Sequence, residues 1–482
     1  MHNITSDMGG VNQAMWRAFG NVSASRYGEI VNSISHPVDE SRRLFFFADA
    51  PHLFKNLRVC LINNKVILLP EKFVKTLKLC SDIVQFVHFK ELVAEQKDYH
   101  LKLAPKLNEN VIKTTTFNKM KVGHAVNMLN RYVSGAFNYM DHENGNKKYE
   151  TTAKFIEIMS KWFGLITARS PMMALGKKEN ERTQNKFNES IQFLNSVIEL
   201  FRNVKIGSDQ RFKPVQRGIL ITTKSVIELT NYLINKRGYS YVLAGRFSQD
   251  CVENLFSNIR KKFPIPNALQ FKHSLKVLMV SQYLQTLQNT NYDQDEGSFI
   301  ADFLRRPVET NHNQFEEISP VLSPGIENKI IGISKKELNS LYGICGYILT
   351  RVSKLTKVCK QCINSAGSTT YNGNSQYSAL LRLRCYKPNT LFFVNDETFR
   401  FFYHMEIEIR RYLPYLKYAK VDFVKFYTVK MKHIQCDTLL NCHNIFEKIM
   451  NRFILYRVKI ECKRGILNAY NSKTMSMHSL IK

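Results

Sequence analysis

The chain has 482 residues, 44% hydrophobic and 12% aromatic, which is longer than a single hydrophobic core usually supports. We therefore expect two or more folded domains and exclude a single small module. The 69 Lys and Arg residues outnumber the 40 Asp and Glu residues, for a formal net charge of +29. This surplus indicates a polyanionic partner, with nucleic acid first. The sequence shows no apolar run of about 18 residues, so we expect no membrane association.

The opening twenty residues lack the charged and then apolar blocks of a secretory signal, so we do not expect export. The ten cysteines are spread along the whole chain. Small disulfide-stapled domains concentrate their cysteines instead, so we interpret these as reduced thiols.

Residues 44–61 predict a strand, a tight turn and a helix. The apolar run Leu44 to Phe47 is typical of a buried strand, and Asp49 follows it as a helix cap. Pro51 fits the first helical turn, where its missing N–H has no cost. Apolar residues then recur at helical spacing: Leu53, Phe54, Leu57 and Leu61.

Between about residues 100 and 245 the pattern predicts helices alone, because apolar residues recur every three or four positions and never alternate. A helix over residues 248–261 follows. On it, Asp250, Glu253 and Ser257 share one face. The opposite face is expected to be buried and carries Val252, Leu255, Phe256 and Ile259.

The second half contains a region of little periodicity and then a basic region. Residues 305–330 include three prolines and are interpreted as a linker. Residues 331–482 are strongly basic, and we expect them to be mostly helical.

Three acids have the context of a metal site: Asp7 before a Gly-rich turn, Asp49 after a strand, and Glu253 on a helix. Carboxylates are the ligands that Mg²⁺ prefers, and two such ions can drive phosphodiester transfer. The alternative stays open, because an Asp after a strand is usually a cap and an exposed Glu is usually just solvated.

Four segments resemble the P element transposases, including the THAP-domain transposases of animals. These segments, which follow one another in the family's order over roughly residues 1 to 300, are TSDMGGVNQAMWRAFG, FFFADAPHLFKNLRVCL, HLKLAPKLNENVIKTTTFNKMKVGHAVNMLN and GRFSQDCVENLFSNIRKKFPIPNALQFK.

The resemblance implies an α/β plus α fold: an RNase H-like core, incomplete at its N-terminus, interrupted by a large helical insertion and followed by a basic, mostly helical region. The corresponding parts are core residues 1–98, insertion 99–245, core 246–304, linker 305–330 and C-terminal region 331–482.

It also implies roles for individual residues. Asp7 matches the family's second catalytic Asp, Glu253 its catalytic Glu, and Asp250 the neighbouring acid; Asp7 and Glu253 would bind Mg²⁺. Asp49 and His52 match an Asp-x-Pro-His-Leu-x-Lys motif that we interpret as supporting the core.

The chain also departs from the family pattern. The first catalytic Asp of the family lies upstream of Asp7, and neither its strand nor the zinc-coordinating THAP module is found before Asp7. We therefore expect a truncated, inactive copy. Relatives bind GTP through the insertion, so GTP binding is expected here by analogy alone. No phosphate-binding Gly-rich loop is recognised in this sequence.

A cysteine pair, Cys359 and Cys362, has the spacing of a structural zinc site, and Cys436 and His443 would complete it. Ordinary reduced cysteines are the alternative. Four cations nearby recur every three residues and predict a basic stripe that follows phosphates, with a solvated helix face as the alternative: Arg351, Lys354, Lys357 and Lys360.

The sequence therefore predicts a nuclear, DNA-binding P element-like transposase or its remnant, related to metal-dependent DNA cleavage and strand transfer. The alternative is a non-catalytic nuclear protein that binds DNA or interacts with a transposase and regulates it. Expected partners are DNA and a related transposase chain or a second copy of this one.

Overall fold

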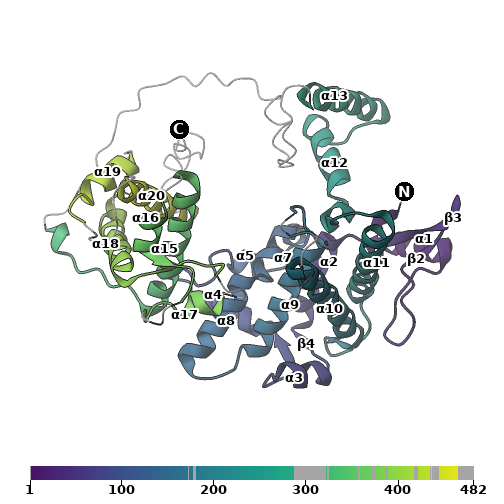
Figure 1. Cartoon of the computed structure of the whole chain (residues 1–482), viewed down its shortest axis with the longest axis horizontal. Coiled ribbons are helices and arrows are strands. Elements are labelled where there is room, and N and C mark those ends of the chain that lie inside the picture. The colour runs from purple at the N-terminus through teal and green to yellow at the C-terminus, as the bar shows by residue number, and fades with distance from the viewer. Residues whose placement is uncertain are drawn as a thin grey trace. The chain divides into compact units, whose positions relative to one another are not determined.

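A computed structural model of the chain describes residues 2–171, 173–176, 181–286, 322, 325–356, 359–371, 373, 375–385, 389–416, 422–434, 436 and 444–464. The fold is mixed α/β and rich in helix (Figure 1). The chain divides into two compact units. The first unit comprises Met1–Leu57 and Lys161–Gln314, and the second comprises Arg58–Ser160 and Phe315–Lys482.

The first unit is built on a three-stranded sheet in the order β1-β3-β2. Strand β1 (Asn3–Ser6) runs parallel to β3 (Asp39–Ala48), and β2 (Ser33–His36) pairs with β3 in the antiparallel sense. Helices and short elements complete the unit: α1 (Gly10–Gly20), the start of α2 (Ala50–Asn64), the end of α9 (Glu150–Ile166), α10 (Glu181–Asn203), β6 (Lys205–Ile206), α11 (Pro214–Arg237), η1 (Ala244–Phe247), α12 (Asp250–Lys262) and α13 (Ala268–Thr286).

Helix α11 covers β3 at close range. The Thr222 hydroxyl donates to the Ala48 carbonyl and accepts from its N–H, both at 2.8 Å, and Ser225 donates to the Phe46 carbonyl at 2.6 Å. Gly218 permits this approach, because a Cβ at that position would collide with Leu53. The strand, turn and helix predicted for residues 44–61 are confirmed, and Phe46 and Leu53 are fully buried.

The second unit is mainly helical. It contains the antiparallel pair β4 (Val66–Leu68) and β5 (Ile83–Gln85), with α3 (Glu71–Leu77), α4 (Val87–Glu95), α5 (Glu109–Ile112), α6 (Thr116–Lys119), α7 (Val122–Met128) and α8 (Arg131–Asn144). Its C-terminal part contains η2 (Ile326–Asn328), α15 (Lys335–Thr356), α16 (Lys360–Ala366), β7 (Gly367–Ser368), α17 (Ala379–Leu383), β8 (Phe393–Val394), α18 (Asp396–Tyr412), η3 (Leu413–Leu416), α19 (Phe423–Lys430) and α20 (Ile445–Lys463).

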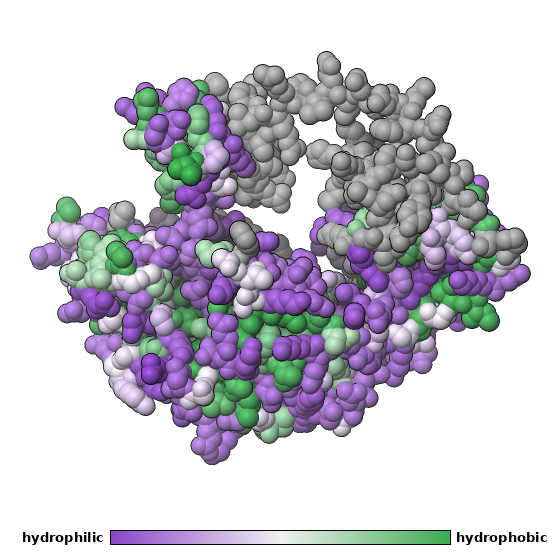
Figure 2. Space-filling model, turned by 180° about the vertical axis from the view of Figure 1, so that it is seen from behind, coloured by the Kyte–Doolittle hydropathy of each residue, from purple (hydrophilic) through white to green (hydrophobic). Residues whose placement is uncertain are grey.

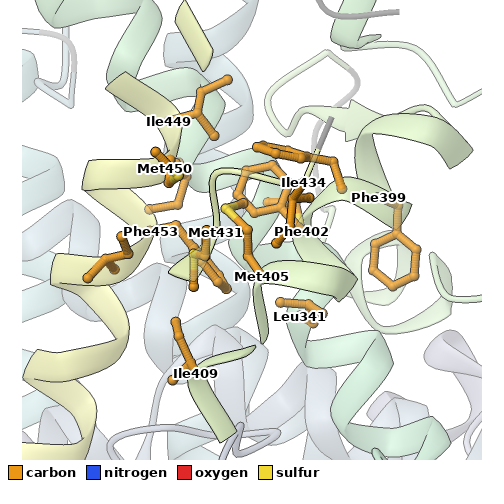
Figure 3. Close-up of a cluster of buried hydrophobic side chains, with 14 of the residues drawn as sticks. Leu341, Phe399, Phe402, Met405, Ile409, Met431, Ile434, Ile449, Met450 and Phe453 are labelled. Carbon is orange, nitrogen blue, oxygen red and sulfur yellow. The ribbon is translucent and has the colours of Figure 1, made fainter. Parts of the chain in front are cut away.

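The core of the second unit lies between α15, α18 and α20 (Figure 3). Leu341, Phe402 and Phe453 are fully buried there, one from each helix. This confirms the mostly helical C-terminal region for the residues described. Within the described ranges, no helix is both long and apolar enough to cross a membrane.

A network of buried ion pairs joins α15, α18 and α20. Arg457 of α20 donates to Glu406 of α18 and to Glu461 of its own helix, and all three side chains are fully buried. Arg410 of α18 bonds both Glu406 and Glu337 of α15. Buried charges are tolerated only when paired, so this network fixes how the three helices pack.

Two sequence expectations are wrong. The stretch from residue 100 to 245 is not helix alone, because the buried Ile206 belongs to the short strand β6. The expected buried face of α12 is largely exposed: only Ile259 is buried, while Val252 and Phe256 are 53% and 37% exposed.

Among the described elements, α12 packs mainly against α13. The Phe256 ring contacts the Phe271 ring of α13, with centroids 5.6 Å apart, and the rest of this face of α12 is left exposed. Hydrophobic side chains are visible on the surface of α13 at the upper left of Figure 2. Most of the expected linker, 305–330, lies outside the described residues, and the predicted domain boundaries stay predictions.

Candidate active site at the carboxyl ends of β1 and β3

The candidate site lies in the first unit, where two parallel strands end side by side. Ser6 of β1 is paired with Ala48 of β3, so the acids that follow them, Asp7 and Asp49, leave the same edge of the sheet. The N–H of Asp49 donates to the Ser6 carbonyl at 2.8 Å, which continues the pairing by one residue. Polar groups at the carboxyl edge of parallel strands are the usual place for a ligand site.

Asp49 is buried, at 1% exposure, and connects two helices. Its Oδ2 accepts from the backbone N–H of His52 at 3.1 Å in the first turn of α2. Its Oδ1 accepts from the backbone N–H of Gln249 at 2.8 Å, and Gln249 is the residue before α12. A carboxylate that receives two backbone N–H donors is committed to capping, so Asp49 holds the start of α12 against the sheet.

His52 and Glu253 meet beside this cap. Nε2 of His52 lies 3.1 Å from Oε1 of Glu253, and the two side chains are 24% and 53% exposed. The structure therefore brings residues from the start of α2 and the first turn of α12 together, although they lie far apart in the sequence.

Asp7 has its own local support. Its Oδ1 accepts from the Gly9 N–H at 2.8 Å and from the Asn12 amide at 2.7 Å. The Gly9 N–H holds the pKa of Asp7 below its ordinary value against the effect of burial, and the Asn12 amide and the charges of His52 and Lys55 act in the same direction. His52 thus contacts Glu253 and also acts on Asp7.

Asp250 makes a different contact. Its carboxylate is paired with Arg169, which follows α9, so its charge is balanced by a cation. Of the residues predicted for the site, Asp49, His52 and Glu253 form one connected group, and Asp7 leaves the same edge of the sheet as Asp49. Asp250 lies on the same helix as Glu253 but is paired with Arg169 instead.

Three supporting residues were not singled out from the sequence: Asn12, Lys55 and Arg169. Lys55 closes the Asp-x-Pro-His-Leu-x-Lys pattern, so that motif carried a signal for it. Asn12 follows Asp7 by five positions and could have been found as its local partner. No sequence pattern pointed to Arg169, because it meets Asp250 only in the folded chain.

Three of the four predicted zinc ligands lie in the core of the second unit or at its edge. Cys362 is fully buried in the apolar cluster, and Cys359 and Cys436 pack at its edge. His443 lies outside the described residues. Among the residues that are described, no three His, Cys, Asp or Glu side chains gather as metal ligands. The zinc site stays a prediction.

The predicted basic stripe is described in part. Arg351 and Lys354 are exposed near the end of α15, and the exposed Lys360 begins α16. Lys357 lies outside the described residues.

Comparisons with known proteins find similarity to transposases. A family model described as "TNP-like, GTP-binding insertion domain" matches residues 52–180. The Transposable element P transposase of Drosophila melanogaster is 26% identical over 372 residues, which is 74% of this chain and 46% of the relative. The chain thus spans about half the length of the curated relative that it matches.

Among solved structures, the Drosophila P element transposase strand transfer complex matches with a TM-score of 0.48 and 24% identity, over 60% of this chain and 61% of that one. The family model and the curated relative agree on one group of proteins. The chain is therefore similar to a P element transposase over 74% of its length.

Proposed function

We propose that this chain is a DNA-binding protein of P element transposase type that acts in the nucleus. Its first unit would contain part of an RNase H-like core, the scaffold of metal-dependent DNA cleavage and strand transfer. The observation that carries the proposal is the meeting of Asp49 and His52, after β3, with Gln249 and Glu253, at the start of α12. Such convergence across a long intervening segment is what an interrupted catalytic core requires.

In this proposal Asp7 and Glu253 are the metal ligands. The chemistry of the donors fits Mg²⁺, which takes carboxylate oxygens. The hydrogen bonds from Gly9 and Asn12 both fall on Oδ1 of Asp7, so Oδ2 is the oxygen that could bind a metal. A bound Mg²⁺ would polarise the scissile phosphodiester and activate the attacking oxygen.

The protein groups around these acids have positioning roles. Asp49 fixes the start of α12, and His52 orients Glu253 through the 3.1 Å contact. Asp250 would become available to the site only if it left Arg169.

GTP is part of the matched family model's description, and for this chain its binding is only a proposal. The hollow of about 310 Å³ in the second unit is lined by residues from Tyr342 to Asp396, outside the matched segment 52–180. No residue of that segment is assigned to GTP, and no step of the proposed mechanism runs through it.

A second candidate function is a non-catalytic DNA-binding protein that regulates a related transposase. Two contacts favour it: Glu253 is paired with His52, and Asp250 with Arg169. A carboxylate that is already engaged with another side chain binds metal less readily, so we also propose that the chain by itself does not cleave DNA.

The test is a nicking assay on supercoiled plasmid DNA with the purified chain and Mg²⁺ or Mn²⁺, beside Glu253→Gln and, as a matched control, the exposed Glu29→Gln. DNA binding without nicking supports the regulatory form. Nicking that Glu253→Gln abolishes and Glu29→Gln preserves supports the catalytic form and contradicts inactivity. A chain that binds no DNA at low salt contradicts both.

A further inference from the structure

Three tyrosines from three helices gather on the surface of the second unit. Tyr347 of α15 and Tyr456 of α20 have ring centroids 5.9 Å apart at an interplanar angle of 49°. Tyr132, in the first turn of α8, is connected to α15 through Arg384: the Arg384 guanidinium lies 5.2 Å from the Tyr132 ring centroid, and its Nη1 lies 3.9 Å from where a Cβ on Gly343 would be, one turn before Tyr347. Tyr132 and Tyr347 are 53% and 46% exposed. A cluster of exposed aromatic rings, unlike a single exposed ring, is typical of a binding surface.

Two arginines support these rings. The Arg351 guanidinium lies over the Tyr347 ring, 5.5 Å from its centroid. The Arg384 guanidinium lies 5.2 Å from the centroid of the Tyr132 ring. The Tyr347 and Tyr132 rings therefore each have a cation against them, which makes the surface both aromatic and positive.

Arg384 is held firmly in place. Its guanidinium donates to the Leu103 carbonyl, and its side chain crosses α8 at Gly135, where a Cβ would lie 2.5 Å from Cγ of Arg384. A residue larger than glycine there would displace the arginine. The fold thus fixes the Tyr132 and Arg384 pair, so little entropy would be lost when a ligand stacks on it.

The charge around the rings selects the ligand. The charged residues of α15 that follow Tyr347 are Arg351 and Lys354, while Lys335 and Lys336 at its start are paired with Glu143 and Glu95 and Glu337 is buried in the ion network. The exposed Arg351 and Lys354 continue from Tyr347 along one side of the helix, at spacings of four and then three residues. Aromatic rings interleaved with cations are the surface on which unpaired bases stack while the backbone is neutralised.

We propose that Tyr132, Tyr347 and Tyr456, with Arg351 and Arg384, form a platform that binds unpaired bases of DNA. This inference rests on the proposed DNA-binding function and deepens it, because it separates a site for single strands from general attraction to duplex phosphates. Arg351 and Lys354 would hold the backbone beside the platform, and the exposed rings of Tyr132 and Tyr347 would hold the bases.

The experiment measures the affinity of the full chain for a single-stranded oligonucleotide containing 2-aminopurine, and for the matching duplex, at one fixed salt concentration. Tyr347→Leu should weaken single-strand binding about tenfold and reduce the quenching of 2-aminopurine, because stacking on one ring is lost. Duplex binding should change by less than about twofold. Tyr347→Phe, which keeps the ring, should restore the single-strand affinity.

Tyr132→Leu tests the platform from an independent helix, and Tyr239→Leu is the matched control, since Tyr239 is also exposed but lies in the first unit. Equal losses for single strand and duplex, no loss in either platform variant, or the same loss in Tyr239→Leu would each overturn the platform. Wild-type chain that binds neither DNA form would instead overturn the proposed function. Unchanged DNA binding with loss of a protein partner would assign the surface to protein contact and overturn the proposal.

Discussion

The carboxylate of Asp49 accepts a hydrogen bond from the backbone N–H of Gln249 at 2.8 Å, across 200 positions of sequence. The same carboxylate accepts the His52 N–H through its other oxygen. One buried side chain thus fixes the entry of α2 and the entry of α12 at the edge of the sheet. The position of Glu253 depends on this junction, because Glu253 lies in the first turn of α12.

Replacing Asp49 should therefore loosen α12 before it loosens the sheet. Asp49→Ala leaves two partly buried N–H groups without their acceptor, at a cost of about 1 to 3 kcal/mol, and Asp49→Asn should cost less because it keeps one acceptor oxygen. Hydrogen exchange measured by mass spectrometry should show faster exchange at the start of α12. Equal exchange in Asp49→Ala and wild type would contradict the capping role.

The exposed Asp39→Ala is the control for that measurement, because its carboxylate bonds only within its own turn and to Arg42. Its loss should leave exchange in α12 unchanged.

The sequence was sufficient to predict the strand and helix around Asp49, because the apolar run and the helical spacing are local signals. The hydrogen bond between Asp49 and Gln249 could not be predicted from the sequence, because a cap that joins distant segments leaves no periodic pattern. The face of α12 was predicted as buried because Val252 and Phe256 share a helical stripe. Amphipathic spacing shows which residues could pack, but the partner that covers them is a property of the tertiary fold.

The pH dependence of stability should change in Glu337→Gln. Burial disfavours the ionised form of Glu337, but the hydrogen bonds and charge of Arg410, with the backbone N–H groups of Leu101 and His100, hold its pKa below the ordinary value. A lowered carboxyl pKa stabilises the fold above the pKa of the unfolded chain, and this contribution is lost as pH falls through the folded pKa.

Wild type should thus be more stable than Glu337→Gln at pH 7, by about 1 to 3 kcal/mol, and this advantage should shrink at acidic pH below about 4. Urea unfolding followed at several pH values measures it. A difference that grew as the pH fell would contradict the assigned direction. The exposed Glu327→Gln serves as control and should show a smaller and flatter difference.

Arg457→Met should be among the most damaging single changes in the second unit. It removes the cation between Glu406 and Glu461 and leaves two fully buried acids without their main partner, which costs about 3 to 5 kcal/mol. The same change at Arg400, exposed on α18, should cost less than about 0.5 kcal/mol. Differential scanning fluorimetry compares the two, and equal melting temperatures would refute a stabilising network.

DNA binding should weaken steeply as salt rises, because each neutralised phosphate releases counterions and the chain carries a net charge of +29. If Lys354 contacts a phosphate, Lys354→Gln should lower duplex affinity and reduce the slope of log affinity against log salt by about 0.9. Lys97→Gln changes an exposed lysine elsewhere in the same unit and should leave the slope unchanged. Fluorescence anisotropy between 50 and 200 mM salt, about the range over which such contacts are lost, provides the measurement. A wild-type affinity that stayed constant over that range would show that phosphate contacts do not carry the binding, and equal slopes for both variants would remove Lys354 from the interface.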